Sequence, residues 1–203
     1  MKNFKTPHES YYETRKIVSF DLLNPNETLF GGHLLAWIDE IAFMTARRFA
    51  GVPYVVTVAM DNITFLEPFR AGENVVLSAS VNYVGRTSME IGVKVAREDS
   101  YTGKRKQTNS AYCTFVALNK NGKPISVPRL KLETPEDHRR YEEAKLRIKS
   151  RAELRRQLKA KLNFKNSSEK EVPEKHVLAI QRVRDYITSV MKINLLTYRR
   201  QNK

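Results

Sequence analysis

Three stretches in the middle of the chain alternate apolar and polar side chains with a period of two, and this alternation restricts the fold most strongly. They span residues 75–82, 89–96 and 111–118. A period of two is typical of strands that bury one face of a sheet. Gly85 lies in a short turn after the first stretch, so the first two strands are expected to be antiparallel neighbours. Asn121 and Gly122 predict another turn after the third strand.

One apolar helix is expected ahead of these strands. From Leu34 to Phe49 apolar residues fall on every side of a helix, which is typical of a buried helix, and Gly51 is suited to end it. A β-branched run from Val55 to Phe65 predicts a further strand. The expected order is an early strand, one helix and then four strands. Because no βαβ unit repeats, a doubly wound parallel sheet is disfavoured.

A carboxylate, Asp39, lies inside the apolar helix, and a paired glycine, Gly31 and Gly32, precedes it. A buried carboxylate needs hydrogen bonds or a shifted pKa, so Asp39 is either a structural hydrogen-bonding residue or a working base. The glycines could leave helix-start N–H groups open to an oxyanion, or they could serve only a tight turn or a close backbone contact. Taken singly, each feature favours the structural interpretation.

The spacing along the helix adds a condition. Asp39 lies seven residues beyond Gly32, which corresponds to roughly 10 Å along a helix axis. A base acts on a group within about 3 Å. One chain alone is therefore not expected to complete a site that uses both ends of this segment.

Four blocks of sequence, taken in order, resemble the hotdog-fold acyl-coenzyme A (acyl-CoA) thioesterases, the group of the bacterial broad-range acyl-CoA thioesterases and the cytosolic acyl-CoA hydrolases. They are NPNETLFGGHLLAWIDE, VVTVAMDNITFLEPFRAGENV, GRTSMEIGVKV and AYCTFVALNKNGKPISVPRL. The resemblance covers about residues 10 to 145. It implies an α+β hotdog fold, in which a curved antiparallel sheet wraps a long central helix, with a C-terminal helical extension. Glu27 stands where the family usually has Gly, so we expect a local difference in that turn.

The resemblance also implies the reaction, which is hydrolysis of acyl-CoA to a fatty acid and coenzyme A. It implies Asp39 as general base or, less favoured, as nucleophile, and Asn24 of the paired protomer as the residue that positions water or substrate. Backbone N–H groups at Gly31 and Gly32 would stabilise the oxyanion. No metal and no cofactor beyond the coenzyme A of the substrate are expected. The expected assembly is a homodimer, and further a trimer of dimers.

Coenzyme A carries phosphates, and Arg86 lies in the block that contributes to the CoA site in this family. Thr87 and Ser88 follow it as hydroxyl donors. Arginine binds phosphate through its planar fork. The alternative, that Arg86 is only a solvated hairpin cation, has equal weight.

No catalytic or metal-binding role is expected for the other reactive side chains. Cys113 is the only cysteine, lies in an alternating strand and has no nearby histidine signature, so burial is favoured over nucleophilic catalysis. The histidines lack metal-ligand spacing. The N-terminal residues do not resemble a secretory signal and no stretch approaches a membrane span, so a cytoplasmic protein is expected.

The chain has a formal net charge of +14, and most of the excess lies after residue 132. We expect a hotdog domain at 1–132, a charged helix at 133–163 with the start signal TPED at residues 134–137, and a linker with a basic amphipathic helix at 164–203. The polar linker is expected from Lys165 to Pro173, and the amphipathic helix from Val177 to about Tyr198. The extension could bind nucleic acid or an anionic membrane, although a helix packing on the oligomer is favoured. A non-catalytic acyl-CoA sensor is the alternative function, and the presence of both Asn24 and Asp39 weighs against it.

Overall fold

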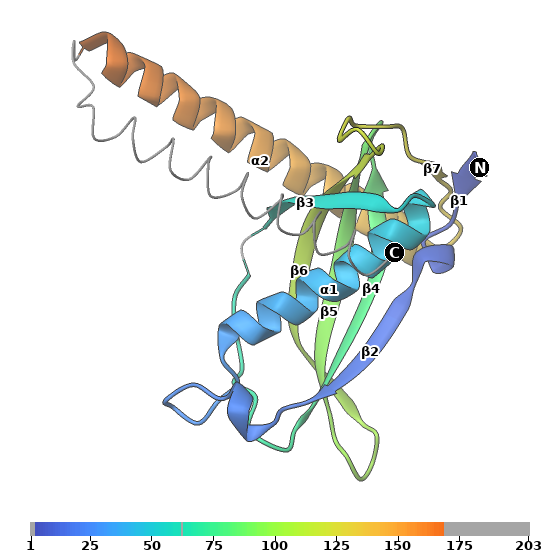
Figure 1. Cartoon of the computed structure of the whole chain (residues 1–203), viewed down its shortest axis with the longest axis vertical. Helices are drawn as coiled ribbons and strands as arrows, with labels where there is room; N and C mark the ends of the chain where they lie inside the picture. Colours follow the sequence, from blue (N-terminus) through green and yellow to red (C-terminus); the bar gives the residue numbers. More distant parts are fainter. Residues whose placement is uncertain (1–2, 62, 169–203) are drawn as a thin grey trace. The chain divides into compact units, whose positions relative to one another are not determined.

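The computed structural model describes residues 3–61 and 63–168 (Figure 1). The chain divides into two compact units, residues 1–148 and 149–203. The first unit contains the whole sheet, the central helix and the first turns of the C-terminal helix. The expected division at residues 132 and 163 stays a prediction.

Five strands form one antiparallel sheet in the order β2-β4-β5-β6-β3. The strands are β2 (Tyr12–Ile17), β3 (Tyr54–Met60), β4 (Asn74–Val84), β5 (Ser88–Glu98) and β6 (Arg105–Leu118). Two short strands, β1 (Phe4–Lys5) and β7 (Arg129–Leu130), form a separate parallel pair. The two helices are α1 (Gly31–Ala50) and α2 (Pro135–Ser168), and short 3-10 turns lie at His8–Ser10 and Phe20–Leu22. The α+β hotdog fold and the antiparallel strands are confirmed.

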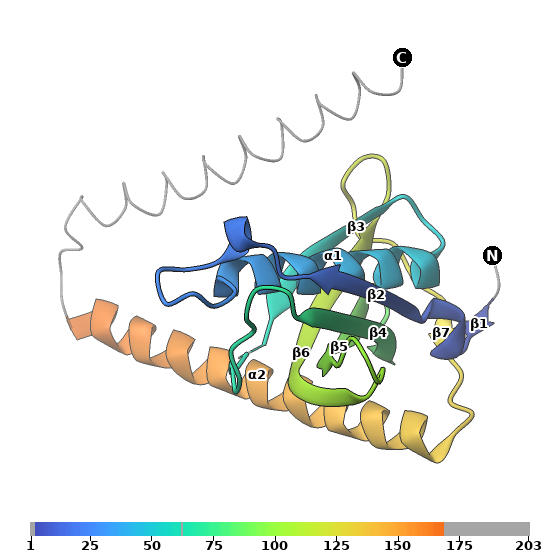
Figure 2. The ribbon, with the colours of Figure 1, turned by 90° about the horizontal axis from the view of Figure 1, so that it is seen from below.

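Helix α1 lies along one face of the curved sheet, as both views of the ribbon show (Figures 1 and 2). Its residues Ile38, Ile41 and Phe49 are fully buried against the inward side chains of the central strands. Gly51 ends the helix in the left-handed conformation at φ 66°, as predicted. Trp37 and Phe43 are only partly buried. The expectation of burial on every side is therefore wrong for a single chain, because the sheet covers one side of α1.

The strand expected from Val55 to Phe65 is shorter than predicted, because β3 ends at Met60. Beyond Asp61, the carbonyl of Thr64 accepts a hydrogen bond from the side chain of Asn109 on β6. This contact is not a main-chain pairing of the two strands. The ladder between β3 and β6 therefore stops, and Phe65 lies in a loop.

Three β-bulges interrupt the pairing of the strands. The extra residues are Val58 on β3, Asn82 on β4 and Thr108 on β6. A bulge bends its strand and increases the local twist. The three bulges are therefore consistent with the curvature of the sheet around α1.

The first turns of α2, residues 135–148, lie on the face of the sheet opposite α1 (Figure 2). Arg140 donates a hydrogen bond to Ser80 Oγ at 3.0 Å. Arg147 lies 2.7 Å from Glu90 Oε1, and its guanidinium carbon lies 3.5 Å from the centroid of the Tyr112 ring. These contacts fix the start of α2 on the sheet.

Helix α2 begins at the TPED start signal, where Thr134 and Asp137 cap each other: the Asp137 N–H donates to Thr134 Oγ1 and the Thr134 N–H donates to Asp137 Oδ2. The helix extends to Ser168, so the linker predicted from Lys165 to Pro173 is wrong for its first residues. The amphipathic helix expected from 177 to 198 lies outside the described residues. None of the described helices is long and apolar enough to cross a membrane.

Candidate active site

Asp39 lies in the middle of α1 and is partly exposed. Its Oδ1 accepts a hydrogen bond of 2.8 Å from the hydroxyl of Thr57 on β3. A carboxylate fixed in this way keeps acceptor capacity on its other oxygen, which can take a proton from water. Sequence reasoning missed Thr57. The β-branched run containing it predicts a strand but does not show which side chain faces the helix.

Asn24 holds the turn that precedes α1. Its Oδ1 accepts hydrogen bonds from the N–H groups of Asn26 at 2.9 Å and Thr28 at 3.3 Å, and its Nδ2 donates to Thr28 Oγ1 at 3.0 Å. Glu27 in this turn has φ 57°, a left-handed conformation that glycine adopts without strain. The turn therefore has a conformation that suits the usual glycine of the family, despite the substitution.

Gly31 and Gly32 are the first two residues of α1, as the oxyanion hypothesis requires. A Cβ atom on Gly32 would lie 2.4 Å from the Phe30 ring, so a larger residue here would force this half-exposed ring to move. In residues 3–61 and 63–168, no backbone acceptor is found for the N–H groups of these two glycines. The start of α1 therefore presents donors to the region next to Phe30.

A single chain does not bring the expected catalytic groups together. The continuous helix places Asp39 about 10 Å along its axis from Gly32. Within the described part of the chain, no hydrogen bond joins Asp39 to Asn24, because Asn24 contacts its own turn. The single-chain geometry thus agrees with the expectation from spacing.

Arg86 and Thr87 lie in the turn between β4 and β5, and Ser88 is the first residue of β5. The register aligns Thr57 with Phe115, and Phe115 with a residue next to Ser88, so this turn lies at the same end of the sheet as Thr57. Two strand spacings separate them, which is roughly 10 Å. Arg86 is exposed, and no ion pair is found for it within the described ranges. The structure therefore places a cation, for which the described residues show no ion pair, at the same end of the sheet as Thr57.

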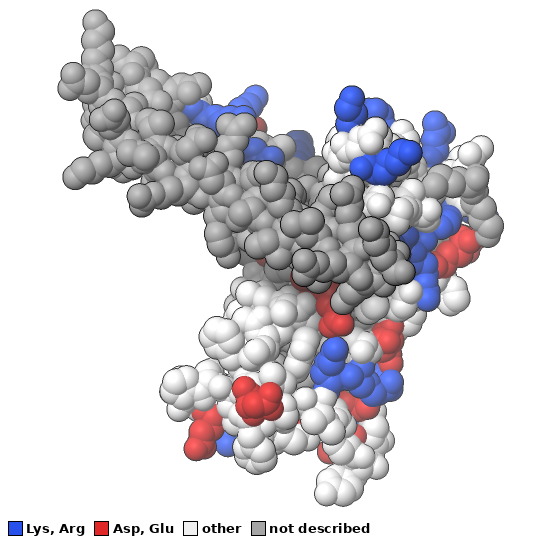
Figure 3. All heavy atoms as spheres, in the orientation of Figure 1, with Lys and Arg blue, Asp and Glu red and all other residues white. Residues whose placement is uncertain are grey.

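The region around Asp39 is apolar and open in one chain. Strand β3 is an edge of the sheet, where Tyr54 and Val58 are 40% and 52% exposed. At the start of α1, Phe30 is 53% exposed and Phe65 is 49% exposed. Figure 3 shows few charged side chains around the N-terminal half of α1. Such a surface is typical of one that another molecule covers.

Cys113 is fully buried on β6, and burial raises the pKa of its thiol to about 12. It therefore remains a neutral thiol at neutral pH and is not a nucleophile. In the part of the chain that the structure describes, no three histidine, cysteine or acidic side chains are grouped so that they could hold a metal ion.

Comparison with known proteins gives consistent matches. The profile of the Thioesterase superfamily matches residues 26–104. The uncharacterized acyl-CoA thioester hydrolase YkhA of Bacillus subtilis is 39% identical over 138 residues, which are 66% of this chain and 80% of that protein.

Solved structures agree. The acyl-CoA hydrolase from Staphylococcus aureus, in complex with butyryl coenzyme A and coenzyme A, is 34% identical, with a TM-score of 0.72 over 82% of this chain and 99% of that chain. Structures are also known of variants of that hydrolase in which an aspartate, an asparagine or a threonine is replaced by alanine. An apo-hexameric acyl-CoA thioesterase is 35% identical, with a TM-score of 0.71 over 74% of this chain and 96% of that chain. The present chain therefore belongs to the thioesterase superfamily, among its hotdog-fold acyl-CoA thioester hydrolases.

Proposed function

We propose that this protein hydrolyses acyl-CoA thioesters to a carboxylic acid and coenzyme A, with Asp39 as the general base. The observation that carries the proposal is the carboxylate of Asp39, which accepts a hydrogen bond of 2.8 Å from Thr57. It lies on a helix whose first two N–H groups, at Gly31 and Gly32, have no backbone acceptor among the described residues. In the Staphylococcus aureus hydrolase the replaced asparagine and aspartate are fifteen positions apart, as Asn24 and Asp39 are here. This spacing supports the choice of the pair.

In the proposed reaction, Asp39 removes a proton from water, and the resulting hydroxide attacks the thioester carbonyl carbon. The N–H groups of Gly31 and Gly32 stabilise the oxyanion of the tetrahedral intermediate. The C–S bond then breaks, and the coenzyme A thiolate takes up the proton held by Asp39, which restores the carboxylate. Asn24 positions the water or the carbonyl through its amide.

The proposed site combines Asp39 of one protomer with Asn24 and Gly32 of its partner, because one chain keeps them apart. Pairing of two β3 edges would cover the exposed Tyr54 and Val58 and close the apolar region around the carboxylate. Because a related acyl-CoA thioesterase is hexameric, we propose a homodimer that assembles further into a trimer of dimers.

Arg86 is proposed to bind a phosphate of coenzyme A, with Thr87 and Ser88 as neighbouring hydroxyl donors. Its support is its exposure and its position at the same end of the sheet as Thr57, the partner of Asp39.

The first test replaces Asp39 by asparagine, which keeps the shape and the hydrogen bond from Thr57. Thiol release from a series of acyl-CoA substrates should fall by about 10²–10⁴-fold, the usual contribution of a general base. The matched control is Glu40→Gln, because Glu40 is the next residue on α1 and pairs with Lys16 outside the site. Equal turnover in the Asp39 variant and the control would end the hypothesis.

A second test asks whether the site is shared between protomers. Asp39→Asn and Asn24→Ala proteins are each purified and then unfolded together and refolded. If the site is shared, a mixed dimer contains one intact site, so random mixing restores about a quarter of the wild-type activity. If each site belongs to one chain, the mixture stays inactive.

A further inference from the structure

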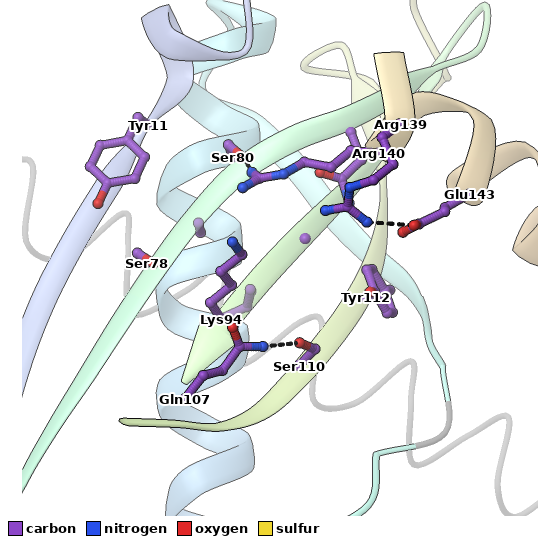
Figure 4. Close-up of a pocket in the computed structure, with 14 residues that line it drawn as sticks. Tyr11, Ser78, Ser80, Lys94, Gln107, Ser110, Tyr112, Arg139, Arg140 and Glu143 are labelled. Atoms are coloured by element: carbon purple, nitrogen blue, oxygen red, sulfur yellow. Dashed lines mark hydrogen bonds and ion pairs between the residues drawn. The ribbon is translucent and has the colours of Figure 1, made fainter. Parts of the chain in front are cut away.

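A pocket of about 400 Å³ lies on the face of the sheet opposite α1, so the sheet separates it from Asp39 (Figure 4). Residues of three strands form its floor, and Arg139, Arg140 and Glu143 of α2 form one wall. Tyr11, just before β2, forms the opposite wall. A volume of this size is within the range of small-molecule sites.

The floor is polar and built from small side chains. Across β4, β5 and β6, one row places Lys94 between Ser78 and Ser110. The adjacent row places Gly92 between Ser80 and Tyr112. The small serine and glycine side chains create the hollow. Ser80 Oγ accepts a hydrogen bond from Arg140 and Ser110 Oγ accepts one from Gln107, and each hydroxyl can still donate its proton to a ligand.

Lys94 is the cation of the pocket for which the described residues show no carboxylate partner. Arg139 pairs with Glu136 and Glu143, and Arg140 pairs with Glu136 at 2.7 Å. Lys94 is exposed, and no ion pair or hydrogen bond is found for its side chain within residues 3–61 and 63–168. In Figure 4 its side chain rises into the middle of the pocket, towards Arg140. The pocket therefore has one positive charge in excess.

A second group in the pocket also lacks a partner. Asn82, the bulged residue of β4, is 4% exposed, and its amide oxygen has no hydrogen-bond partner in the described part of the chain. Its side chain lies over Gly92, where a Cβ atom would be 2.4 Å from the amide nitrogen. A buried, unpartnered acceptor costs free energy, roughly 1–3 kcal/mol. A ligand with a hydroxyl or N–H donor would remove that cost.

We infer that this pocket binds a small organic phosphate, a phosphate monoester that also carries hydroxyl groups. The phosphate would lie at Lys94 and the serine hydroxyls beside it, and a hydroxyl of the ligand would donate to Asn82. The site is separate from the proposed hydrolysis of acyl-CoA, and its ligand is neither the acyl chain nor the thioester.

The test measures binding by calorimetry to the full-length protein, with ribose 5-phosphate, inorganic phosphate and adenosine 5′-monophosphate as probes. Ribose 5-phosphate should bind saturably and at least tenfold more tightly than inorganic phosphate. Lys94→Gln should weaken this binding by about tenfold or more, the contribution of a hydrogen bond to a charged group. Because Lys94 has no partner within the described ranges, this variant should fold normally.

Lys104→Gln is the matched control, because Lys104 is also exposed and lies in a loop outside the pocket. If Lys104→Gln binds ribose 5-phosphate as tightly as the wild type does, the result supports the site. If adenosine 5′-monophosphate binds more tightly than ribose 5-phosphate, the natural ligand is a nucleotide. If it binds more weakly, the natural ligand is a sugar phosphate. Either result agrees with the proposal. Absence of saturable binding, equal loss in both lysine variants, or equal affinity for inorganic phosphate would overturn it.

Discussion

The contact between Arg147 and Glu90 joins α2 to the sheet and leads to a quantitative prediction. The Glu90 side chain is 1% exposed and that of Arg147 is 21% exposed, with 2.7 Å between them. Replacing Arg147 by methionine keeps an apolar stem of similar length and leaves the carboxylate buried and uncompensated. Breaking a buried ion pair in this way costs about 3–5 kcal/mol. Because solvent reaches part of the Arg147 side chain, we expect about 3 kcal/mol, near the lower end of the range.

The assay is urea unfolding at one fixed protomer concentration, followed by the fluorescence of Trp37, the only tryptophan. A fixed concentration is needed because subunit association contributes to apparent stability. Arg156→Met is the matched control, since the Arg156 side chain is 78% exposed and its pair with Glu153 should contribute less than about 1 kcal/mol.

A double variant distinguishes the loss of the ion pair from the cost of leaving Glu90 buried without a partner. Arg147→Met combined with Glu90→Leu removes both charges, and it should recover most of the stability lost in the single variant. A single variant no less stable than Arg156→Met would refute the reasoning. So would a double variant in which the two losses simply add.

Three further outcomes are expected. Thr57→Val should lower turnover about 10- to 100-fold because Asp39 loses a charge-assisted hydrogen bond, whereas Thr57→Ser should restore most of it; a loss confined to KM would contradict this. Val58→Lys should shift sedimentation towards smaller species and reduce activity with it, because a charge would stand on the exposed β3 edge; an unchanged oligomer would show that this edge is not the interface. Burial raises the pKa of Cys113 from 9.0 to about 12. The neutral thiol therefore contributes its full stability below pH 9, and this contribution is lost as the pH rises towards 12. Cys113→Ala should lose less stability than the wild type between pH 9 and 12, and equal losses would contradict the assignment.

The parts of the fold that sequence could predict are those with local signals. The period of two places β4, β5 and the second half of β6 correctly, and Gly51 and the TPED signal mark the C-terminus of α1 and the start of α2. The sequence predicts burial on every side of α1, whereas the sheet covers only one side, because counting apolar residues does not show which side faces the sheet. The length of β3 was also overestimated, because the side chain of Asn109 replaces ladder pairing beyond its end.

The residues of the candidate site also differ in how clearly the sequence indicates them. Asp39, Gly31 and Gly32 stand out in the sequence because their residue types are unusual for an apolar helix and its start. Thr57 does not, because its contact with Asp39 depends on the register of an edge strand that also contains a bulge. Lys94 does not stand out either, because in the sequence it is only a polar position within the alternating stretch 89–96. Its place in a pocket depends on side chains from three strands and a helix.

The order of the strands has a consequence for how the chain folds. Strands β4, β5 and β6 are consecutive and pair with their sequence neighbours, whereas β3 reaches β6 only after two other strands have intervened. Loop-closure entropy makes such distant pairing slow, so the three-stranded meander is expected to form before β3 docks. The hydrogen bond between Thr57 and Asp39 would then be among the last native contacts to form. During refolding, return of hydrolysis should trail the return of β-sheet circular dichroism.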